Sequence, residues 1–418
     1  MESLVERHQT GWARDLLSTF PAVVVQGARQ VGKSTFAGVV CADRDHVSVT
    51  LDDIAAADAA HIDPTSFVEQ AGPGTLVIDE IQRDTSLLLA IKASIDRDRR
   101  PGRFLLTGSS DLLRLTRTPD SLAGRAVTLE LRGLSQGELA GEREDFAAWV
   151  RSADGDLGGP DSTWTRQDYV RAIARGGYPE VRDFDERMRG VWFDSYLERV
   201  LHRDIGDVSR GLSSDRLTSI IRLVAANQGG EMVQARLADE LAIPKSAVAS
   251  YLSALETLCL TNDVAPWRAN LTKREIGRHK VSVADSGLAL RLARLTPAGL
   301  SRLDAASTVG RQLEAFVVAE ILKQRGWSGE RFEVGHFRDR DGLEVDVVLE
   351  FADGSAFLVE VKATATYRAE HVKAIRELAG RLGDRFLGGA VLGLSPHRVQ
   401  LARGVWGVPV SVLWDHAG

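Results

Sequence analysis

Residues 27–34 read GARQVGKS, and this stretch decides the fold of the amino-terminal part of the chain. It matches the pattern GxxxxGK[ST], in which the backbone N–H groups of a glycine-rich loop surround a phosphate at the start of a helix. An apolar run at residues 22–25 precedes the loop, and a helical pattern follows it. The sequence therefore predicts a phosphate-binding loop between a strand and a helix.

The loop residues have separate expected roles in holding ATP and Mg²⁺. Gly27 and Gly32 let the backbone turn its N–H groups inward. Lys33 would reach the β- and γ-phosphates, and the Ser34 hydroxyl would ligate Mg²⁺. The residues expected to bind the nucleotide and its metal are Gly27, Ala28, Gln30, Val31, Gly32, Lys33, Ser34, Thr35 and Asp79.

A second motif, TLVIDEIQR at residues 75–83, is an apolar strand pattern that ends in two acids. Asp79 would belong to the Mg²⁺ shell, and Glu80 would orient and deprotonate the attacking water. A buried strand with two acids at its solvent end has the same pattern, but the phosphate loop upstream favours the catalytic interpretation. The presence of Glu80 indicates hydrolysis as well as binding.

Two further segments complete the expected ATPase site. The apolar run at residues 104–106 is followed by Thr107 and Ser109, whose hydroxyls could contact the γ-phosphate or the attacking water, with a plain turn as the alternative. In SLAGRA at residues 121–126, Arg125 is the first candidate and Arg117 the second for an arginine finger on a neighbouring subunit's nucleotide. Surface ion pairs are the alternative. A finger implies a homo-oligomer with Glu80, Lys33, Arg125 and Thr107 as its catalytic residues.

The pattern of residues 21–140 predicts an α/β fold. Short apolar runs alternate there with helical segments, which is typical of a parallel sheet flanked by helices. These runs are residues 22–25, 47–51, 75–78, 104–106 and 126–131. A polar, glycine-rich stretch at residues 151–162 is the expected domain boundary.

Composition limits the class of protein. At 418 residues, with 44% hydrophobic and 26% charged residues, the chain is expected to form several globular domains. The net charge of −6 excludes a globally basic nucleic-acid coat, although not a local basic patch. Cys41 and Cys259 lack metal-site spacing and are expected to be buried thiols. Because no apolar run approaches the roughly 20 residues of a membrane span and no signal sequence is apparent, we expect a cytoplasmic protein without membrane contact.

The ordered set of motifs resembles a known family. GARQVGKSTF, VTLDD, LVIDEIQR, LLTGSS, SLAGR and GGYPEV follow one another as in a large prokaryotic family of AAA-type ATPases with a carboxyl-terminal domain of unknown function. One departure is Ala28, where proline is frequent in the family. The resemblance implies an AAA core at residues 1–150, a helical lid or linker at 163–210, a winged-helix-like domain at 211–280 and a restriction-endonuclease-like domain at 281–418.

The middle of the chain shows a helix-turn-helix pattern at residues 233–258, with Pro244 suited to start the second helix. The positions expected to be exposed on that helix include one cation, so sequence-specific base recognition is doubtful. They are Lys245, Ser246, Ala249, Ser250 and Ser253. Residues 268–280 hold a basic cluster that could neutralise DNA phosphates non-specifically, form a solvated face or contact another subunit. Its members are Arg268, Lys273, Arg274, Arg278 and Lys280.

Residues 343–363, LEVDVVLEFADGSAFLVEVKA, predict a hairpin whose register decides a second site. A two-residue loop would oppose Asp346 to Val361, whereas a three-residue loop would oppose Asp346 to Glu360. In the second register Asp346 and Glu360 could share a divalent ion beside Lys362.

This arrangement resembles the D…(E)xK signature of restriction-endonuclease-like folds, and Glu314 matches the helical acid that many members add. The expected metal ligands of the whole chain are thus Ser34, Asp79, Asp346 and Glu360. Two functions remain open: an ATPase that acts on or near DNA through a nuclease-like half, and a nucleotide-dependent switch whose carboxyl-terminal half is a non-catalytic protein-interaction module.

Overall fold

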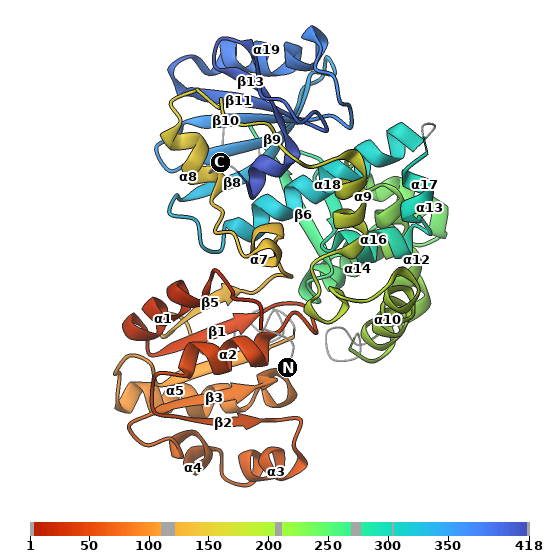
Figure 1. The fold of residues 1–418 in the computed structure, drawn as a ribbon. Coiled ribbons are helices and arrows are strands. Elements are labelled where there is room, and N and C mark those ends of the chain that lie inside the picture. Colours follow the sequence, from red (N-terminus) through yellow and green to blue (C-terminus); the bar gives the residue numbers. More distant parts are fainter. Residues whose placement is uncertain (1–3, 110–121, 205–210, 269–276, 303–304, 416–418) are drawn as a thin grey trace. The chain divides into compact units, whose positions relative to one another are not determined.

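The computed structural model describes the chain except residues 1–3, 110–121, 205–210, 269–276, 303–304 and 416–418 (Figure 1). It divides into two compact units. The first comprises Met1–Leu134, His202–Gly211 and Thr257–Cys259, and the second comprises Ser135–Leu201, Leu212–Glu256 and Leu260–Gly418.

The first unit is built on a 5-stranded sheet of order β2-β3-β4-β1-β5, and every neighbouring pair is parallel. Its strands are β1 (Ala22–Gln26), β2 (His46–Thr50), β3 (Thr75–Asp79), β4 (Phe104–Gly108) and β5 (Ala126–Glu130). The apolar runs of the sequence are these strands, so the predicted parallel sheet is confirmed. Strands β1, β3 and β4 are almost fully buried, as expected for the centre of a sheet covered on both faces.

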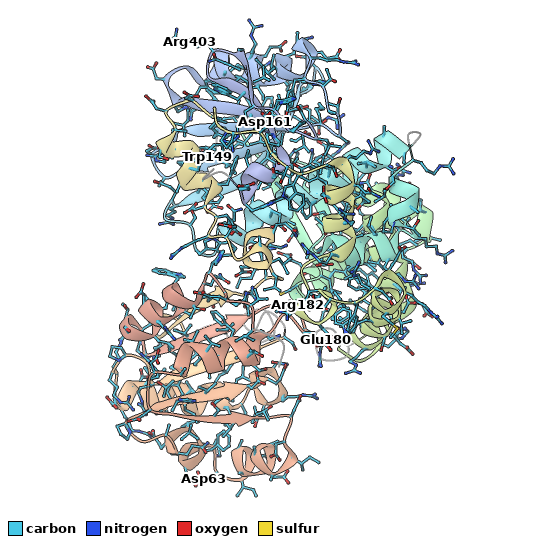
Figure 2. All side chains as sticks on the ribbon, in the orientation of Figure 1. Asp63, Trp149, Asp161, Glu180, Arg182 and Arg403 are labelled. Carbon is cyan, nitrogen blue, oxygen red and sulfur yellow. The ribbon has the colours of Figure 1, made fainter. Side chains whose placement is uncertain are left out.

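Among the described residues, one helix precedes the first strand, and four others lie between strands. They are α1 (Thr10–Thr19), α2 (Lys33–Cys41), α3 (Ile54–Ile62), α4 (Pro64–Glu69) and α5 (Leu87–Arg97). Asp63, labelled in Figure 2, lies between α3 and α4. Its carboxylate accepts a 3.0 Å hydrogen bond from the Ser66 N–H and so caps the start of α4. Pro64 at the first position of α4 lacks an N–H that would need a partner there.

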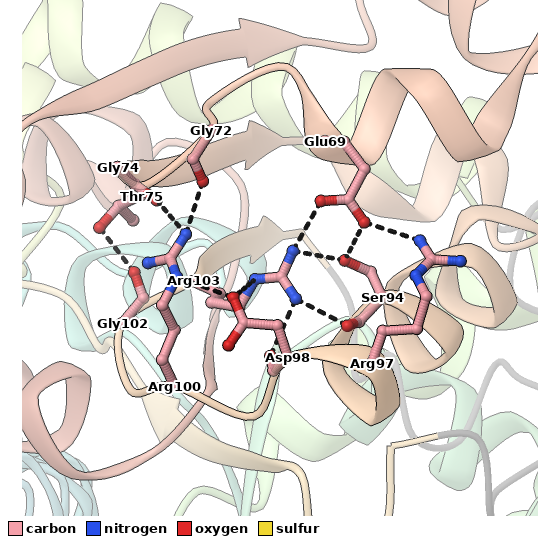
Figure 3. A network of polar contacts seen from close by, with 10 residues as sticks. All are labelled: Glu69, Gly72, Gly74, Thr75, Ser94, Arg97, Asp98, Arg100, Gly102 and Arg103. Atoms are coloured by element: carbon pink, nitrogen blue, oxygen red, sulfur yellow. Dashed lines mark hydrogen bonds and ion pairs between the residues drawn. The ribbon is translucent and has the colours of Figure 1, made fainter.

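A buried arginine fixes the amino ends of β3 and β4 (Figure 3). Arg103 lies directly before β4 and is 5% exposed. Its guanidinium donates to the Glu69 carboxylate at 2.8 Å and to the Ser94 carbonyl at 2.6 Å, and it also contacts Asp98. These contacts join α4, α5 and the start of β4 at the amino ends of the strands, opposite the phosphate loop.

The second unit contains helices that surround a mixed sheet. Its helices include α7 (Gln136–Ala140), α8 (Phe146–Ser152), α9 (Arg166–Arg175), α10 (Glu186–Arg199), α12 (Ser214–Ala226), α13 (Gln234–Leu241), α14 (Lys245–Thr257), α16 (Ser286–Leu292), α17 (Pro297–Leu300), α18 (Ala306–Gln324) and α19 (Lys373–Leu382). No helix in the described part of the chain combines the length and the hydropathy needed to span a bilayer.

The sheet of the second unit has 8 strands in the order β12-β13-β11-β10-β9-β8-β6-β7. They are β6 (Thr261–Pro266), β7 (Lys280–Val283), β8 (Phe332–Arg338), β9 (Glu344–Phe351), β10 (Ala356–Val361), β11 (Phe386–Gly393), β12 (Val399–Ala402) and β13 (Val405–Pro409). One face packs on α18 through Phe316 and Val317, and the other packs on α19 through Ile375 and Leu378. The antiparallel pair β6–β7 follows α13 and α14 and extends the sheet through β8.

The compact units and the expected domains divide the chain at different places. The first unit's amino-terminal segment ends at Leu134, whereas the sequence predicts an ATPase core up to residue 150. Helix α8 belongs to the second unit, where the Phe146 ring meets the Phe357 ring edge-on at 6.1 Å. The predicted boundaries inside the second unit remain predictions.

Candidate functional site

The phosphate loop follows β1 and is held against the residue that follows β5. A Cβ atom at Gly27 would lie 2.1 Å from the Leu131 carbonyl oxygen, so only glycine fits this approach of two backbones. The Leu131 N–H in turn donates to the Gln26 carbonyl at 2.7 Å. The first glycine of the motif is therefore required by packing as well as by the turn.

The loop has the backbone shape that a phosphate cradle needs. Gln30 and Gly32 are left-handed, with φ of 62° and 92°, and α2 starts directly after Gly32. Arg7 clamps the loop, because its guanidinium donates to the Val31 carbonyl at 3.0 Å and to the Arg132 carbonyl at 2.6 Å. Nothing in the sequence pattern around Arg7 marks this role.

Lys33 lies at the mouth of the loop. Its ammonium donates to the carbonyl oxygens of Gly27 at 3.1 Å and Ala28 at 3.0 Å. Burial lowers the pKa of Lys33, and the nearby Glu80 and Asp79 carboxylates act in the opposite direction. The next residues of α2, Ser34 and Thr35, are exposed. The charged end of Lys33 thus lies against the first two residues of the loop.

Strand order brings the expected metal ligands together. The Ser34 hydroxyl donates a 2.8 Å hydrogen bond to the Asp79 carboxylate at the end of β3. The Thr107 hydroxyl, from the end of β4, bonds the other oxygen of the same carboxylate. In the strand order, β4 is the neighbour of β3, and β1, which leads into the loop and α2, lies beyond β4 on the same side. The structure therefore gathers Ser34, Asp79 and Thr107 at one point.

Glu80 follows Asp79 in a strained conformation. Its φ of 57° and ψ of 43° are left-handed, which is unusual for a residue with a side chain. Its N–H donates to the Thr107 hydroxyl at 3.2 Å. The Gln82 amide bonds the Glu80 carboxylate and also donates to the Ser109 hydroxyl at 2.8 Å. Gln82, which sequence reasoning did not single out, links the expected base to the second candidate hydroxyl.

The two candidate fingers are placed differently. Arg117 lies outside the described residues. The Arg125 guanidinium donates hydrogen bonds of 2.6 and 3.0 Å to the two oxygens of the Asp96 carboxylate. Arg125 precedes β5 at the amino end of the sheet, whereas the phosphate loop follows the carboxyl end of β1. A strand of this length separates the two ends by roughly 13 Å, so Arg125 cannot serve the nucleotide of its own chain.

In the second unit, the β9–β10 hairpin has the three-residue loop. Phe351 and Ser355 are joined by a 2.9 Å backbone hydrogen bond, and Gly354 has a φ of 81°. Pairing then runs from Ala356 with Glu350 to Val359 with Val347. The next residues in this register are Asp346 and Glu360, as predicted.

A β-bulge places Asp346. Gly335 of β8 faces Val348 and Phe337 faces Val345, so Asp346 and Val347 together face the single residue His336. Such an extra residue re-aims side chains locally. The Asp346 carboxylate accepts a 2.8 Å bond from the Val361 N–H of β10. The alternation of a regular strand could not have predicted this contact.

Lys280 lies among carboxylates. Its ammonium is 2.7 Å from Glu314, 2.8 Å from Glu344 and 3.7 Å from Asp346. Burial acts to lower the pKa of Lys280, but these three acids together raise it. The expectation that Lys280 belongs to a solvent-facing basic cluster is therefore wrong: its side chain is 7% exposed and pairs with carboxylates.

Glu360 and Lys362 form the other half of this acidic centre. Lys362 pairs with one oxygen of the Glu360 carboxylate. The other oxygen, Oε2, is buried and has no hydrogen-bond partner among the described residues. Burial and the Asp346 carboxylate raise the pKa of Glu360, and burial and Asp346 do the same for Glu314. An unpartnered carboxylate oxygen beside a second carboxylate fits a cation, although the described residues hold no group of three metal-ligating side chains.

A groove of about 560 Å³ lies between α13, α14 and the β6–β7 pair. The exposed face of α14 carries the predicted residues Lys245, Ser246, Ala249, Ser250 and Ser253. The groove is lined by cations and acids alike, including Lys245, Arg278, Glu256 and Asp263. Within the groove, His279 contacts Asp263 at 2.6 Å. Lys273 and Arg274 of the basic cluster lie outside the described residues.

Comparison with known families assigns the first unit. The family model described as "AAA domain" matches residues 19–140. Residues 19–140 are an AAA-type P-loop ATPase domain. Two models described as domains of unknown function, DUF8612 and DUF4143, match residues 166–299 and 309–413. The AAA domain thus contains every residue of the loop and of the Asp79–Glu80 motif.

Relatives of the chain extend beyond the AAA domain. The uncharacterized proteins Mb2031c of Mycobacterium bovis and Rv2008c of Mycobacterium tuberculosis are each 26% identical over 366 residues, which cover 87% of this chain and 75% of theirs. Among solved structures, the Walker-type ATPase PABY2304 of Pyrococcus abyssi matches 70% of this chain and 96% of its own at 15% identity and a TM-score of 0.41. AMPPCP-bound DnaA from Aquifex aeolicus matches 59% of this chain and 85% of its own at 11% identity and a TM-score of 0.24.

Proposed function

We propose that the AAA domain hydrolyses ATP at the ends of β1, β3 and β4. The observation that carries the proposal is the 2.8 Å contact between the Ser34 hydroxyl and the Asp79 carboxylate. A hydroxyl and a carboxylate side by side are the oxygen ligands that suit Mg²⁺ of a bound nucleotide. When bound, that Mg²⁺ would neutralise the charge of the β- and γ-phosphates.

The chain's own residues divide the remaining work. The loop N–H groups and Lys33 would hold the phosphates, for which the Lys33 ammonium exchanges its two carbonyl partners. Glu80 would accept a proton from the attacking water as the water oxygen bonds the γ-phosphorus and the bond to the β-phosphate oxygen breaks. Thr107 would hold the Asp79 carboxylate and the Glu80 backbone in place.

Two variants of the full chain test this proposal. Lys33→Ala should abolish tight ATP binding, whereas Glu80→Gln should keep binding and stop turnover, because Glu80 acts on water only during the reaction. Binding is measured with a fluorescent ATP analogue and turnover by phosphate release. Asp58→Asn, at an exposed position on α3, is the matched control and should change neither. Wild-type turnover by Glu80→Gln would show that Glu80 is not the base.

We also propose that the second unit contacts DNA without sequence preference. The support is the groove beside the exposed face of α14, which Lys245 and Arg278 line. Acids line the same groove, so binding should be weak and strongly salt-dependent. Replacing Lys245 and Arg278 by alanine should weaken binding of a labelled duplex. Arg236→Ala, on α13 and outside the groove lining, should not. No binding at low salt would instead favour a nucleotide-dependent switch with a protein-interaction module.

A nuclease activity of the acidic centre is the third function that we propose. The unpartnered Glu360 Oε2 beside Asp346 favours it, because that oxygen could act as a ligand of a divalent ion held there. Lys362 would stabilise negative charge that develops during cleavage, and Glu314 would be the third acid of the site. Duplex and single-stranded DNA and RNA, incubated with Mn²⁺ with and without ATP, test it. Cleavage that survives Asp346→Asn would not come from this centre.

A further inference from the structure

A lysine outside the hairpin signature supplies the cation of the acidic centre. Lys280 reaches it from β7, whereas Asp346 and Glu360 lie on β9 and β10 and Glu314 lies on α18. The ammonium contacts Glu314 and Glu344 within 2.8 Å and Asp346 at 3.7 Å. It thus meets carboxylates from a helix and from a strand.

Buried carboxylates that lie close together need a compensating positive charge. Asp346 is 7% exposed and Glu360 is 8% exposed, so water screens their repulsion poorly. A divalent ion or an ammonium group can each supply the missing charge. In this structure Lys280 does so for Glu314, Glu344 and Asp346, and Lys362 does so for one oxygen of Glu360.

We propose that the Lys280 ammonium is the resident cation of the acidic centre and competes with a divalent ion for Asp346. This inference rests on the proposed metal site at Asp346 and Glu360. Asp346 cannot direct its full charge to an incoming ion while Lys280 remains in place, because the positive charges repel each other across a shared ligand. Lys280 therefore sets how readily the centre takes a metal.

The position of Lys280 in the fold links the acidic centre to the groove beside α14. It is the last paired residue of the β6–β7 hairpin, where it faces Val264. Strand β7 is the edge strand of the sheet, and on its outer side an isolated antiparallel bridge pairs Lys280 with Glu231. The preceding residues Arg278 and His279 line the groove of about 560 Å³. An occupant of that groove would contact the same short segment that positions Lys280.

Metal titration of the full chain tests the competition. All proteins carry Lys33→Ala, which weakens any contribution of the ATP site, and Mn²⁺ binding is followed by calorimetry. Lys280→Met should bind Mn²⁺ about tenfold more tightly or better, as expected when a charge-assisted contact to a ligand is removed. Lys280→Arg keeps the charge and should stay close to wild type. Adding Asp346→Asn to Lys280→Met should remove the gain.

Three results would contradict this inference. Equal Mn²⁺ affinity of Lys280→Met and of the parent protein that keeps Lys280 would contradict the role of Lys280. It would not contradict the metal site. Absence of binding in both would overturn the metal site and the competition together. A gain that persists with Asp346→Asn would place the ion elsewhere and overturn the competition at Asp346.

A second measurement uses the native lysine, since Lys280→Met leaves carboxylates uncompensated and could unfold. An amine-acetylating reagent followed by peptide mass spectrometry reports how accessible Lys280 is. Because the ammonium must leave for the ion to enter, saturating Mn²⁺ should increase acetylation of Lys280 severalfold and leave the exposed Lys245 unchanged. Unchanged or lower labelling of Lys280 at saturating Mn²⁺ would overturn the proposal.

Discussion

The Ser34 hydroxyl near the start of α2 and the Asp79 carboxylate at the end of β3 lie 2.8 Å apart, although 45 positions separate them in the chain. Thr107 bonds the second oxygen of the same carboxylate from the strand between them. The Asp79 side chain is therefore held in one orientation by hydroxyls on both sides. The first two predictions below concern this carboxylate and its neighbour Glu80.

Thr107 is expected to act by positioning. Thr107→Val keeps the shape but leaves the Asp79 oxygen and the Glu80 N–H without their hydroxyl partner. We expect kcat for ATP to fall by about tenfold or more, because both hydrogen bonds of the Thr107 hydroxyl are lost, with little change in KM. Thr107→Ser retains the hydroxyl and should restore most of the rate in a phosphate-release assay. Wild-type kcat in Thr107→Val would contradict this role.

The left-handed backbone of Glu80 is expected to cost stability. At this φ of 57°, glycine avoids the clash that a Cβ atom meets. The free energy of unfolding of Glu80→Gly should therefore exceed that of Glu80→Ala by about 1 kcal/mol in denaturant unfolding. The same pair at Asp58, inside α3, should show the opposite order, because glycine destabilises helix interiors. Both Glu80 variants should lack turnover. If Glu80→Gly were no more stable than Glu80→Ala, the left-handed conformation would be absent in solution.

Arg125 is proposed to act on a neighbouring subunit's nucleotide. If it does, Arg125→Ala should lower turnover by on the order of 100-fold or more. Asp96→Asn breaks the same ion pair but keeps the arginine, so it separates loss of a finger from loss of the pair. Light scattering of Glu80→Gln with ATP should show self-association. Equal losses in Arg125→Ala and Asp96→Asn, or a strict monomer, would assign Arg125 to a surface ion pair.

Glu144 is expected to make the second unit less stable as pH rises. It is 1% exposed, and burial raises its pKa to about 8. Its neutral form is favoured in the folded state, so its stabilising effect is complete below the unfolded pKa near 4.3 and is lost as pH rises towards 8. Glu144→Gln should therefore gain stability over wild type between pH 5 and pH 8.5, by at least about 1 kcal/mol in urea unfolding.

A matched acid separates this effect from general charge repulsion. Glu142→Gln removes a charge from an exposed position two residues away and should shift stability equally at both pH values. A constant difference between Glu144→Gln and wild type from pH 5 to pH 8.5 would mean that Glu144 is ionised throughout in the folded protein.

The hairpin illustrates how far local sequence reaches. Gly354 supplies the left-handed residue of a three-residue loop, and that loop alone sets the pairing of Phe351 with Ser355. The opposition of Asp346 and Glu360 follows from it. The bulge at Asp346 does not, because it depends on His336 of a different strand. The sequence pattern assigns Lys280 to a basic cluster for the same reason, since its acidic partners come from the distant elements α18 and β9.

The amino-acid sequence by itself determined the phosphate loop, the parallel strands and the acids at the end of β3. These features depend on residues within a few positions of one another, through strand periodicity, glycine geometry and turn length. The tertiary structure alone decided that Gln82 joins Glu80 to Ser109, that Arg7 holds the loop and that Lys280 lies among three carboxylates. Each of these contacts depends on strand order or on packing between distant segments, which local patterns do not encode.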